Sequence, residues 1–157
     1  MYVTIYLIIY YLIFNKRNSI LTKGTIMDYV TVEQMVKEAK ENLHEFSVED
    51  VKKKLSNNNV CIIDIRDSSE CIENGIIPGS FHVSRGVLEF NADPKCEYYK
   101  DFFDKDREII LYCHTGSRSA LASATLKEMG YTNVAHMKGG FKDWMRKIGD
   151  IDDYKKM

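Results

Sequence analysis

The sequence predicts one α/β domain built around a mostly parallel sheet. Short apolar runs, which are typical of buried strands, alternate along the chain with segments whose apolar residues recur at helical spacing. Alternation of this kind favours parallel strands joined by helices. The 157 residues suffice for one domain with one core and are too few for two ordinary domains. A content of 45% hydrophobic and 29% charged residues is typical of soluble globular proteins.

Apolar spacing and capping residues predict the helices. The apolar side chains that follow the capping residue Thr31 lie three and four positions apart. Ser47, with Asp50 three positions later, is close to a capping box. Gly75 and Gly130 end two further helical segments. The predicted helices span residues 31–44, 47–55, 68–75, 117–129 and 139–149.

The predicted strands are short apolar runs bounded by turn residues. "VCIIDI" carries one acid in an apolar run, as expected of a buried parallel strand whose carboxyl end faces a site. Residues 87–108 are polar and irregular, and no element is predicted before the strand that begins at residue 107. The predicted strands span residues 60–65, 78–83, 107–113 and 132–137.

Composition and charge exclude several classes of function. The formal net charge is -1 with basic residues spread along the chain, so no nucleic-acid partner is expected. Cys61, Cys71, Cys96 and Cys113 have no CxxC or other metal-ligand spacing, and we expect no metal and no cofactor. We interpret them as thiols of a reducing compartment, which predicts a cytoplasmic protein.

The chain begins with an apolar extension, residues 1–26. Residues 1–14 are almost wholly apolar, but as a helix they would span only about 21 Å of a roughly 30 Å hydrocarbon core. Lys16 and Arg17 follow the apolar run, whereas a secretory signal carries its positive charge before it. Either translation begins at Met27, which we favour, or residues 1–14 form a short membrane anchor. If residues 1–14 insert, the positive-inside rule leaves the domain facing the cytoplasm. A chain that begins at Met27 is likewise expected in the cytoplasm.

Cys113 is the leading candidate for a functional residue. It lies where the apolar run "IILYC" stops, and sites in alternating strand–helix folds form at such strand ends. The free N–H groups and positive dipole end of the next helix would stabilise a Cys113 thiolate, making it a nucleophile near neutral pH. Gly116 permits the backbone angles that turn several N–H groups toward one point, and Arg118 adds a permanent positive charge. The hydroxyls of Ser117 and Ser119 would cap or line this nest. The competing interpretation is a buried structural cysteine beside an ordinary turn.

Four blocks of the sequence resemble the single-domain rhodanese-type sulfurtransferases. "CHTGSRS" is similar to the active loop of that family, and "VCIIDIRDSSE" to its strand with D-x-R and a following Glu. "GIIPGSFHV" resembles G-H-I-P-G-A-x-x-[IV], and "GYTNVAHMKGGFKDW" resembles the closing strand with its G-G-[FWY]-x-x-W turn. The resemblance implies a rhodanese-like three-layer fold, with helices on both faces of the sheet, over residues 47–150. A helical segment at residues 27–46 would precede this domain, and a tail at residues 151–157 would follow it.

The resemblance implies that Cys113 carries sulfur. Its thiol would take a sulfane sulfur from thiosulfate or a persulfide and hand it to a thiol or to cyanide. A sulfur-relay protein is a further candidate partner. Backbone N–H groups of the loop would hold the outer sulfur of the persulfide. The implied binding loop comprises His114, Thr115, Gly116, Ser117, Arg118 and Ser119.

Three polar residues at the end of a neighbouring strand are the expected supports of this loop. Asp64 is expected to brace loop N–H groups, and Arg66 to face incoming anions. An internal ion pair involving Arg66 and Glu70 is the alternative. Glu70 is also a candidate to pair with Arg118 and fix its orientation.

Two other functions stay open. A rhodanese-fold module could keep the loop and act as a sulfur carrier or regulatory partner, although the intact Cys113, Gly116 and Arg118 favour an enzyme. Phosphatases and arsenate reductases of the same fold use C-x5-R, a wider cradle for a tetrahedral oxyanion. The C-x4-R spacing of this chain suits a single sulfur atom, which ranks those two activities last.

The chain departs from the family pattern at two positions. Ile76 stands where His is usual, and we expect it to alter hydrogen bonding near the turn rather than catalysis. Cys71 stands where an aromatic residue usually follows the Glu. A packed thiol is the favoured interpretation, and a resolving thiol is the alternative. His114 is expected to face solvent, and His82 and His136 to be structural.

A chain that begins at Met27 is predicted to fold and to take up sulfur as well as the full chain does, because every motif lies downstream of it. Circular dichroism and mass spectrometry after incubation with a sulfur donor check this expectation. Loss of folding on removal of residues 1–26 would show that the apolar extension belongs to the core.

Overall fold

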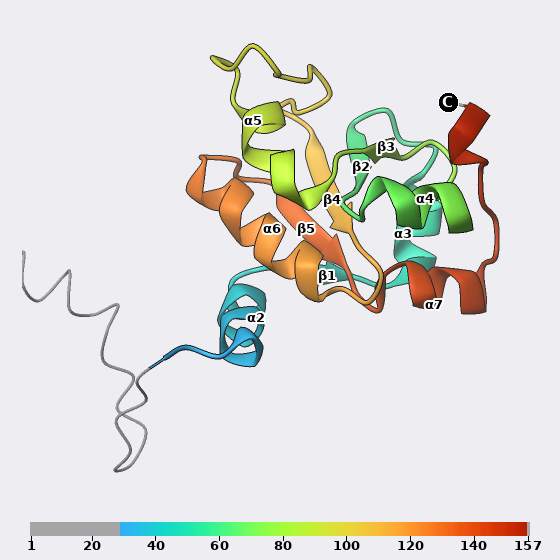
Figure 1. The fold of residues 1–157 in the computed structure, drawn as a ribbon, viewed down its shortest axis with the longest axis horizontal. Coiled ribbons are helices and arrows are strands. Elements are labelled where there is room, and N and C mark those ends of the chain that lie inside the picture. Colours follow the sequence, from blue (N-terminus) through green and yellow to red (C-terminus); the bar gives the residue numbers. More distant parts are fainter. Residues whose placement is uncertain (1–28, 157) are drawn as a thin grey trace, which may run out of the picture. The chain divides into compact units, whose positions relative to one another are not determined.

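The fold consists of one five-stranded parallel sheet between helices. The computed structural model describes residues 29–156, and the interpretations of residues 1–26 lie outside this part. The sheet belongs to the unit that begins at Val32. The strand order is β1-β5-β4-β2-β3, and every neighbouring pair is parallel, which confirms the predicted fold class (Figure 1). The strands are His44–Phe46 (β1), Val60–Asp64 (β2), Phe81–His82 (β3), Glu108–Tyr112 (β4) and Val134–Met137 (β5).

The helices fill the connections between the strands. Ser47 caps α3 as predicted, because its hydroxyl oxygen accepts the Asp50 N–H at 3.1 Å. None of the helices in residues 29–156 is long and apolar enough to cross a membrane. The α-helices of the described chain are Val32–Glu41 (α2), Val48–Lys54 (α3), Ser68–Asn74 (α4), Leu88–Ala92 (α5), Ser117–Glu128 (α6) and Gly140–Lys147 (α7), with 3₁₀ turns at Arg85–Val87 (η1) and Tyr154–Lys156 (η2).

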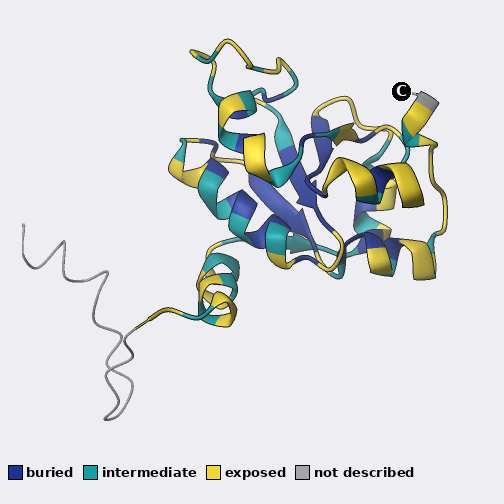
Figure 2. Ribbon diagram, in the orientation of Figure 1, coloured by how far each residue is buried: buried dark blue, intermediate teal, exposed yellow. Residues whose placement is uncertain are grey.

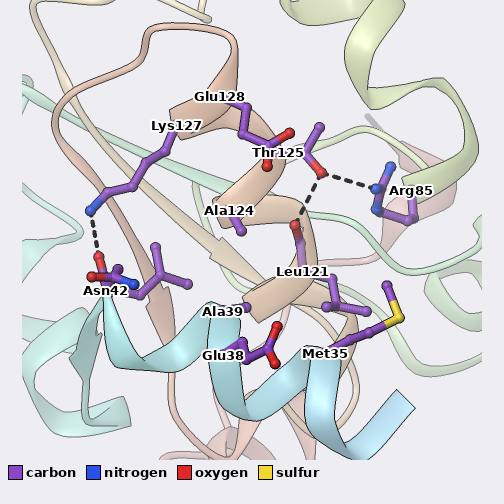
Figure 3. A pocket seen from close by; sticks show the side chains of 11 residues that line it. Met35, Glu38, Ala39, Asn42, Arg85, Leu121, Ala124, Thr125, Lys127 and Glu128 are labelled. Atoms are coloured by element: carbon purple, nitrogen blue, oxygen red, sulfur yellow. Dashed lines mark hydrogen bonds between the residues drawn. The ribbon is translucent and has the colours of Figure 1, made fainter. Parts of the chain in front are cut away.

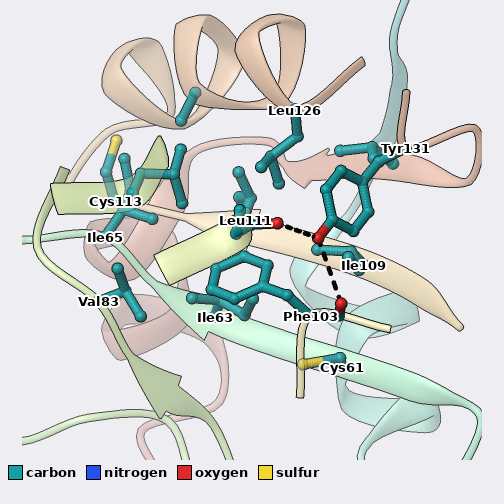
Figure 4. Packing of buried hydrophobic residues seen from close by; sticks show 14 residues of the cluster. Cys61, Ile63, Ile65, Val83, Phe103, Ile109, Leu111, Cys113, Leu126 and Tyr131 are labelled. Atoms are coloured by element: carbon teal, nitrogen blue, oxygen red, sulfur yellow. Dashed lines mark hydrogen bonds between the residues drawn. The ribbon is translucent and has the colours of Figure 1, made fainter. Parts of the chain in front are cut away.

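The central strands β2, β4 and β5 are buried on both faces, as their dark colour in Figure 2 shows. Successive side chains of β4 point to opposite faces, so Leu111 and then Cys113 fall on one side and Tyr112 on the other. The first face packs under α5 and α6 (Figure 4). The second face packs against α3 and α7, where Phe141 and Trp144 are buried. Cys113 therefore continues the side-chain alternation of β4 and borders the core under α6.

The first strand was missed by the sequence prediction. The predicted helix over residues 31–44 ends at Glu41, and residues 44–46 form β1, which pairs with β5 at the edge of the sheet. The last three residues of the predicted helical segment 27–46 are thus strand. Three residues are too few to show the alternating pattern that reveals a longer strand.

Two other segments are more ordered than predicted. Residues 87–108 include α5, whose Leu88 and Ala92 are fully buried. The predicted tail, residues 151–157, is attached to the domain at two points. Asp152 exchanges backbone hydrogen bonds with Ile76, and the Tyr154 hydroxyl lies 2.8 Å from His82 Nδ1. Both attachments join residues far apart in the sequence, where local patterns carry no signal.

Candidate active site

Cys113 lies directly after β4 and next to the first turn of α6. Only 1% of the residue is exposed. Gly116 is the N-cap of α6, and its N–H donates to Cys113 Sγ at 3.1 Å. Gly116 has a φ of +103°, a conformation that side chains rarely adopt, so glycine at this position allows the loop to curl back onto the sulfur. The predicted contact between Cys113 and the N-terminus of the following helix is present in the structure.

The loop presents backbone to the sulfur and most of its side chains to solvent. His114, Thr115 and Ser117 are exposed, and the exposure of His114 agrees with its prediction. Ser119 is buried, and its hydroxyl donates to the carbonyl of Gly116 at 3.1 Å. Ser119 therefore fixes the conformation of the loop at its glycine.

Arg118 is held in a two-pronged ion pair with Glu70, as one of the sequence hypotheses proposed. The two guanidinium NH₂ groups donate to the two carboxylate oxygens at 2.7 and 2.9 Å. The hydrogen bond from Arg118 lowers the pKa of Glu70 to about 2, and the same bond raises the pKa of Arg118. A second carboxylate, that of Asp67, lies 3.9 Å from the guanidinium. The positive charge of Arg118 is thus offset by α4.

Asp64 and Arg66 form a buried ion pair, which corrects the expected role of Asp64 and gives Arg66 the internal ion pair of the alternative, with Asp64 in place of Glu70 as its partner. Arg66 is 1% exposed and Asp64 is 0% exposed. The guanidinium of Arg66 contacts both carboxylate oxygens, at 2.6 Å for the closest pair, and donates to the Gly75 carbonyl at 2.7 Å. Asp64 accepts from the backbone and side chain of Arg66 instead of bracing the N–H groups of the Cys113 loop. Arg66 is turned inward and does not face incoming anions.

Cys71 is a packed thiol in this structure. It is fully buried, and its Sγ lies 3.6 Å from Asp64 Oδ2. Burial, with a further contribution from the Asp64 charge, raises the pKa of Cys71 to about 12. A thiol in that state supplies almost no thiolate near neutral pH, so the packed interpretation is favoured over a resolving thiol.

His82 and His136 have structural contacts. His82 Nε2 lies 2.9 Å from the Arg66 carbonyl oxygen, and Nδ1 faces the Tyr154 hydroxyl, so Nε2 carries the proton and donates. His136 is fully buried with Nε2 2.7 Å from Glu45 Oε1, and burial lowers its pKa. Each histidine joins two segments of the fold.

Sequence reasoning missed a second contact of the loop that follows Cys113. The N–H groups of Phe141 and Lys142, in the first turn of α7, donate to the carbonyls of Cys113 and His114 at 2.8 and 3.0 Å. The signal that could have found it is the Gly-Gly pair at residues 139–140, which was interpreted only as a turn. Glycine pairs of this kind allow close backbone approach.

A cavity lies away from Cys113 and its loop. It has a volume of about 620 Å³ and lies between α2 and α6 (Figure 3). Met35, Ala39, Leu121 and Ala124 line it, together with Arg85, which is engaged by Glu89 and Thr125. None of the predicted site residues borders this cavity. The residues that the structure describes contain no cluster that could hold a metal ion.

Comparisons with known proteins agree with this geometry. The model of the Rhodanese-like domain matches residues 47–147. The chain belongs to this rhodanese-like domain family. It is 30% identical over 116 residues to a thiosulfate:glutathione sulfurtransferase of Saccharomyces cerevisiae, covering 69% of this chain and 83% of the yeast protein. It is 32% identical over 107 residues to a candidate sulfur carrier protein of Bacillus subtilis, covering 68% of this chain but about half of the relative, 53%.

The solved structures show the same rhodanese-like fold. A protein of unknown function from Rhodopseudomonas palustris, described as a possible tyrosine phosphatase, superimposes with a TM-score of 0.74 at 37% identity. The match covers 83% of this rhodanese-like chain and all of the other.

The ion pair between Glu70 and Arg118 is predicted to stabilise the fold in a defined pH range. Folding lowers the pKa of Glu70 from 4.5 to about 2, so its stabilisation is complete above pH 4.5 and is lost as the pH falls through 2. The variant Glu70→Gln should therefore be less stable than the original protein at neutral pH, and the difference should shrink toward pH 2. Urea unfolding at a series of pH values measures it.

The variants Arg118→Gln and Arg118→Gln with Glu70→Gln are the controls. Both variants should lack the pH-dependent part of the unfolding free energy that Glu70→Gln also removes, because either change removes the ion pair. If the pH-dependent stabilisation persists in Arg118→Gln, it comes from another partner of Glu70.

Proposed function

We propose that this rhodanese-like protein is a sulfurtransferase that carries sulfur as a persulfide on Cys113. The single observation behind the proposal is the placement of Cys113 at the end of β4, with the Gly116 N–H 3.1 Å from its sulfur. A helix N-terminus and a curled glycine loop favour the thiolate, which is the nucleophilic form of cysteine. The names of relatives, among them a thiosulfate:glutathione sulfurtransferase, support the same chemistry.

The proposed reaction has two displacement steps. The Cys113 thiolate attacks the outer sulfur of thiosulfate, a new S–S bond forms, and sulfite leaves with the electron pair of the broken S–S bond. With a persulfide donor, the leaving group is the donor thiolate. An acceptor thiolate or cyanide then attacks the outer sulfur, takes it, and releases Cys113 as the thiolate. The outer sulfur bears the negative charge between the two steps, and loop N–H groups are the donors suited to hold it.

The charges around the loop favour donors of low negative charge. Arg118 is the loop's permanent cation, but Glu70 binds it at 2.7 Å and Asp67 lies 3.9 Å away. Two carboxylates against one guanidinium leave no net positive charge in this group. A dianion such as thiosulfate gains little there, so we propose a high KM for thiosulfate and better use of persulfide donors, namely the persulfides of small thiols or of a sulfur-relay protein.

Two other functions rank lower. A sulfur carrier or regulatory module would form the same persulfide without turnover, and the B. subtilis relative bears a carrier name. A phosphatase is suggested by the R. palustris protein, which is described as a possible tyrosine phosphatase. The C-x4-R loop and the paired Arg118 both disfavour a phosphate substrate, since a tetrahedral dianion requires a wide and cationic cradle.

Cys113 alone is predicted to carry the transferred sulfur. Cys61 and Cys71 are fully buried, and burial raises their pKa values to about 11 and about 12, while Cys96 lies in a loop with no helix N-terminus beside it. The variant Cys113→Ser should fold and show no added sulfur atom by mass spectrometry after incubation with thiosulfate or a persulfide. Cys71→Ser is the matched control and should load normally. Loading and turnover in Cys113→Ser would refute the proposal.

Adding a cation to the loop is predicted to change the choice of donor. Ser117 is exposed at the start of α6, so Ser117→Arg adds charge without disturbing the core. The KM for the dianion thiosulfate should fall more than the KM for a persulfide donor of lower negative charge, and the gain should shrink as the salt concentration rises. Steady-state kinetics at two salt concentrations measure it, with Ser117→Gln as the uncharged control. Equal effects on the two donors would show that the backbone nest selects the donor.

A further inference from the structure

Two helices begin at the loop that follows Cys113. The loop leads into α6, and α7 starts beside it, after β5 (Figure 1). The first N–H groups of any helix have no partner within that helix. In α6, the N-cap N–H is directed at Cys113 Sγ. The second helix, α7, has a different partner.

The first turn of α7 binds the carbonyl oxygens of the catalytic loop. The Phe141 N–H donates to the Cys113 carbonyl at 2.8 Å, and the Lys142 N–H donates to the His114 carbonyl at 3.0 Å. Cys113 is 1% exposed, so its carbonyl is held in a region with little water to compete. These two bonds fix the orientations of two consecutive peptide groups.

Peptide geometry then determines where the loop N–H groups point. The described residues contain no cis peptide bonds, and in a trans peptide the N–H points opposite to the C=O of the same group. The Cys113 carbonyl shares its peptide with the His114 N–H, and the His114 carbonyl shares its peptide with the Thr115 N–H. Because both carbonyls are directed at α7, both N–H groups are directed away from it.

Glycine is required for this approach. A Cβ added at Gly140 would lie 2.4 Å from the Cys113 carbonyl oxygen and 2.6 Å from the His114 carbonyl oxygen. Gly140 also has a φ of +62° and Gly139 a φ of +75°. A side chain at residue 140 would therefore push α7 away from the loop carbonyls.

We propose that the first turn of α7 is a positioning element for sulfur transfer: the N–H groups of Phe141 and Lys142, admitted by Gly140, orient the loop so that the His114 and Thr115 N–H groups serve the sulfur on Cys113. That the N–H groups bind sulfur rests on the function proposed above. The orientation of the two peptide groups does not depend on that function. Preorganised N–H donors of this kind need no rearrangement when negative charge forms.

The variant Lys142→Pro tests the proposal directly. Proline removes one N–H from the first turn of a helix, where it is tolerated, and the side chain of Lys142 is exposed. Lys142→Ala keeps the N–H and is the matched control. In Lys142→Pro, the pH at half-maximal alkylation of Cys113 by iodoacetamide should rise, and sulfur loading should slow by roughly tenfold. Lys142→Ala should match the original protein in both measurements.

A second pair of variants applies if Lys142→Pro does not fold. Gly140→Ala places a methyl group against the loop carbonyls, whereas Gly149→Ala carries the same kind of strain at a φ of +82° beyond the other end of α7, with its nearest neighbour 3.8 Å away. The alkylation midpoint should rise in Gly140→Ala and stay unchanged in Gly149→Ala.

Unchanged alkylation and loading in a folded Lys142→Pro, or in Gly140→Ala, would overturn the proposal. Alkylation needs no sulfur donor, so the alkylation midpoint tests the role of α7 separately from the proposed sulfur transfer. An original protein that takes up no sulfur refutes the proposed function, while the shift of the alkylation midpoint still decides the role of α7.

Discussion

The site depends on the burial of one guanidinium, that of Arg66. A charge removed from water must be paired and fully hydrogen-bonded, and Asp64 together with the Gly75 carbonyl meets this requirement. The guanidinium carbon also lies 3.7 Å from the ring centre of Phe141, the residue whose N–H binds the Cys113 carbonyl. Arg66 thereby joins the end of β2, the turn after α4 and the first turn of α7. Two contacts hold the loop that follows Cys113: the Glu70 carboxylate on α4 and the N–H groups of α7. Both belong to segments that the Arg66 side chain contacts.

Little free charge remains at the site, so under the proposed function the backbone would be the main source of stabilisation for an anionic sulfur. Arg66 is neutralised by Asp64, and Arg118 is bound by Glu70. A phosphate dianion would require free cations, whereas a single sulfur atom is small enough to be held by a few N–H groups that converge on one point. Loop N–H groups are held in fixed directions when the carbonyls of their peptides accept hydrogen bonds. The first turn of α7 and the Ser119 hydroxyl donate hydrogen bonds to loop carbonyls. The loop is thus complementary to a small anion through its conformation.

Sequence reasoning succeeded where one local pattern determines the outcome. Cys113 at the end of an apolar run and Gly116 at the helix start follow from strand ends and turn chemistry. The pairing of Glu70 with Arg118 joins residues far apart in the sequence, and the resemblance offered it as one of two alternatives for Glu70. Sequence reasoning failed where the outcome depends on whether tertiary packing buries a side chain. Asp64 and Arg66 stand two positions apart beside a strand end, a pattern that fits an exposed anion site as well as a buried pair, and only the packing of Phe141 over the guanidinium decides between them. Strand β1 and the attachment of Asp152 were missed for a related reason, since both are formed by partners remote in sequence.

The departure from the family pattern at Ile76 is explained by the burial of this residue beneath the C-terminal segment. Ile76 is fully buried and exchanges backbone hydrogen bonds with Asp152 at 3.0 and 2.9 Å. A Cβ on the preceding Gly75 would lie 2.8 Å from the Asp152 carbonyl, so glycine admits the C-terminal segment at this turn. An imidazole at residue 76 would bury two nitrogen atoms that need partners, whereas an isoleucine needs none. The anchor of Arg66 at this turn is the carbonyl of Gly75, which is a backbone group, and the replacement of the usual His by Ile leaves it intact.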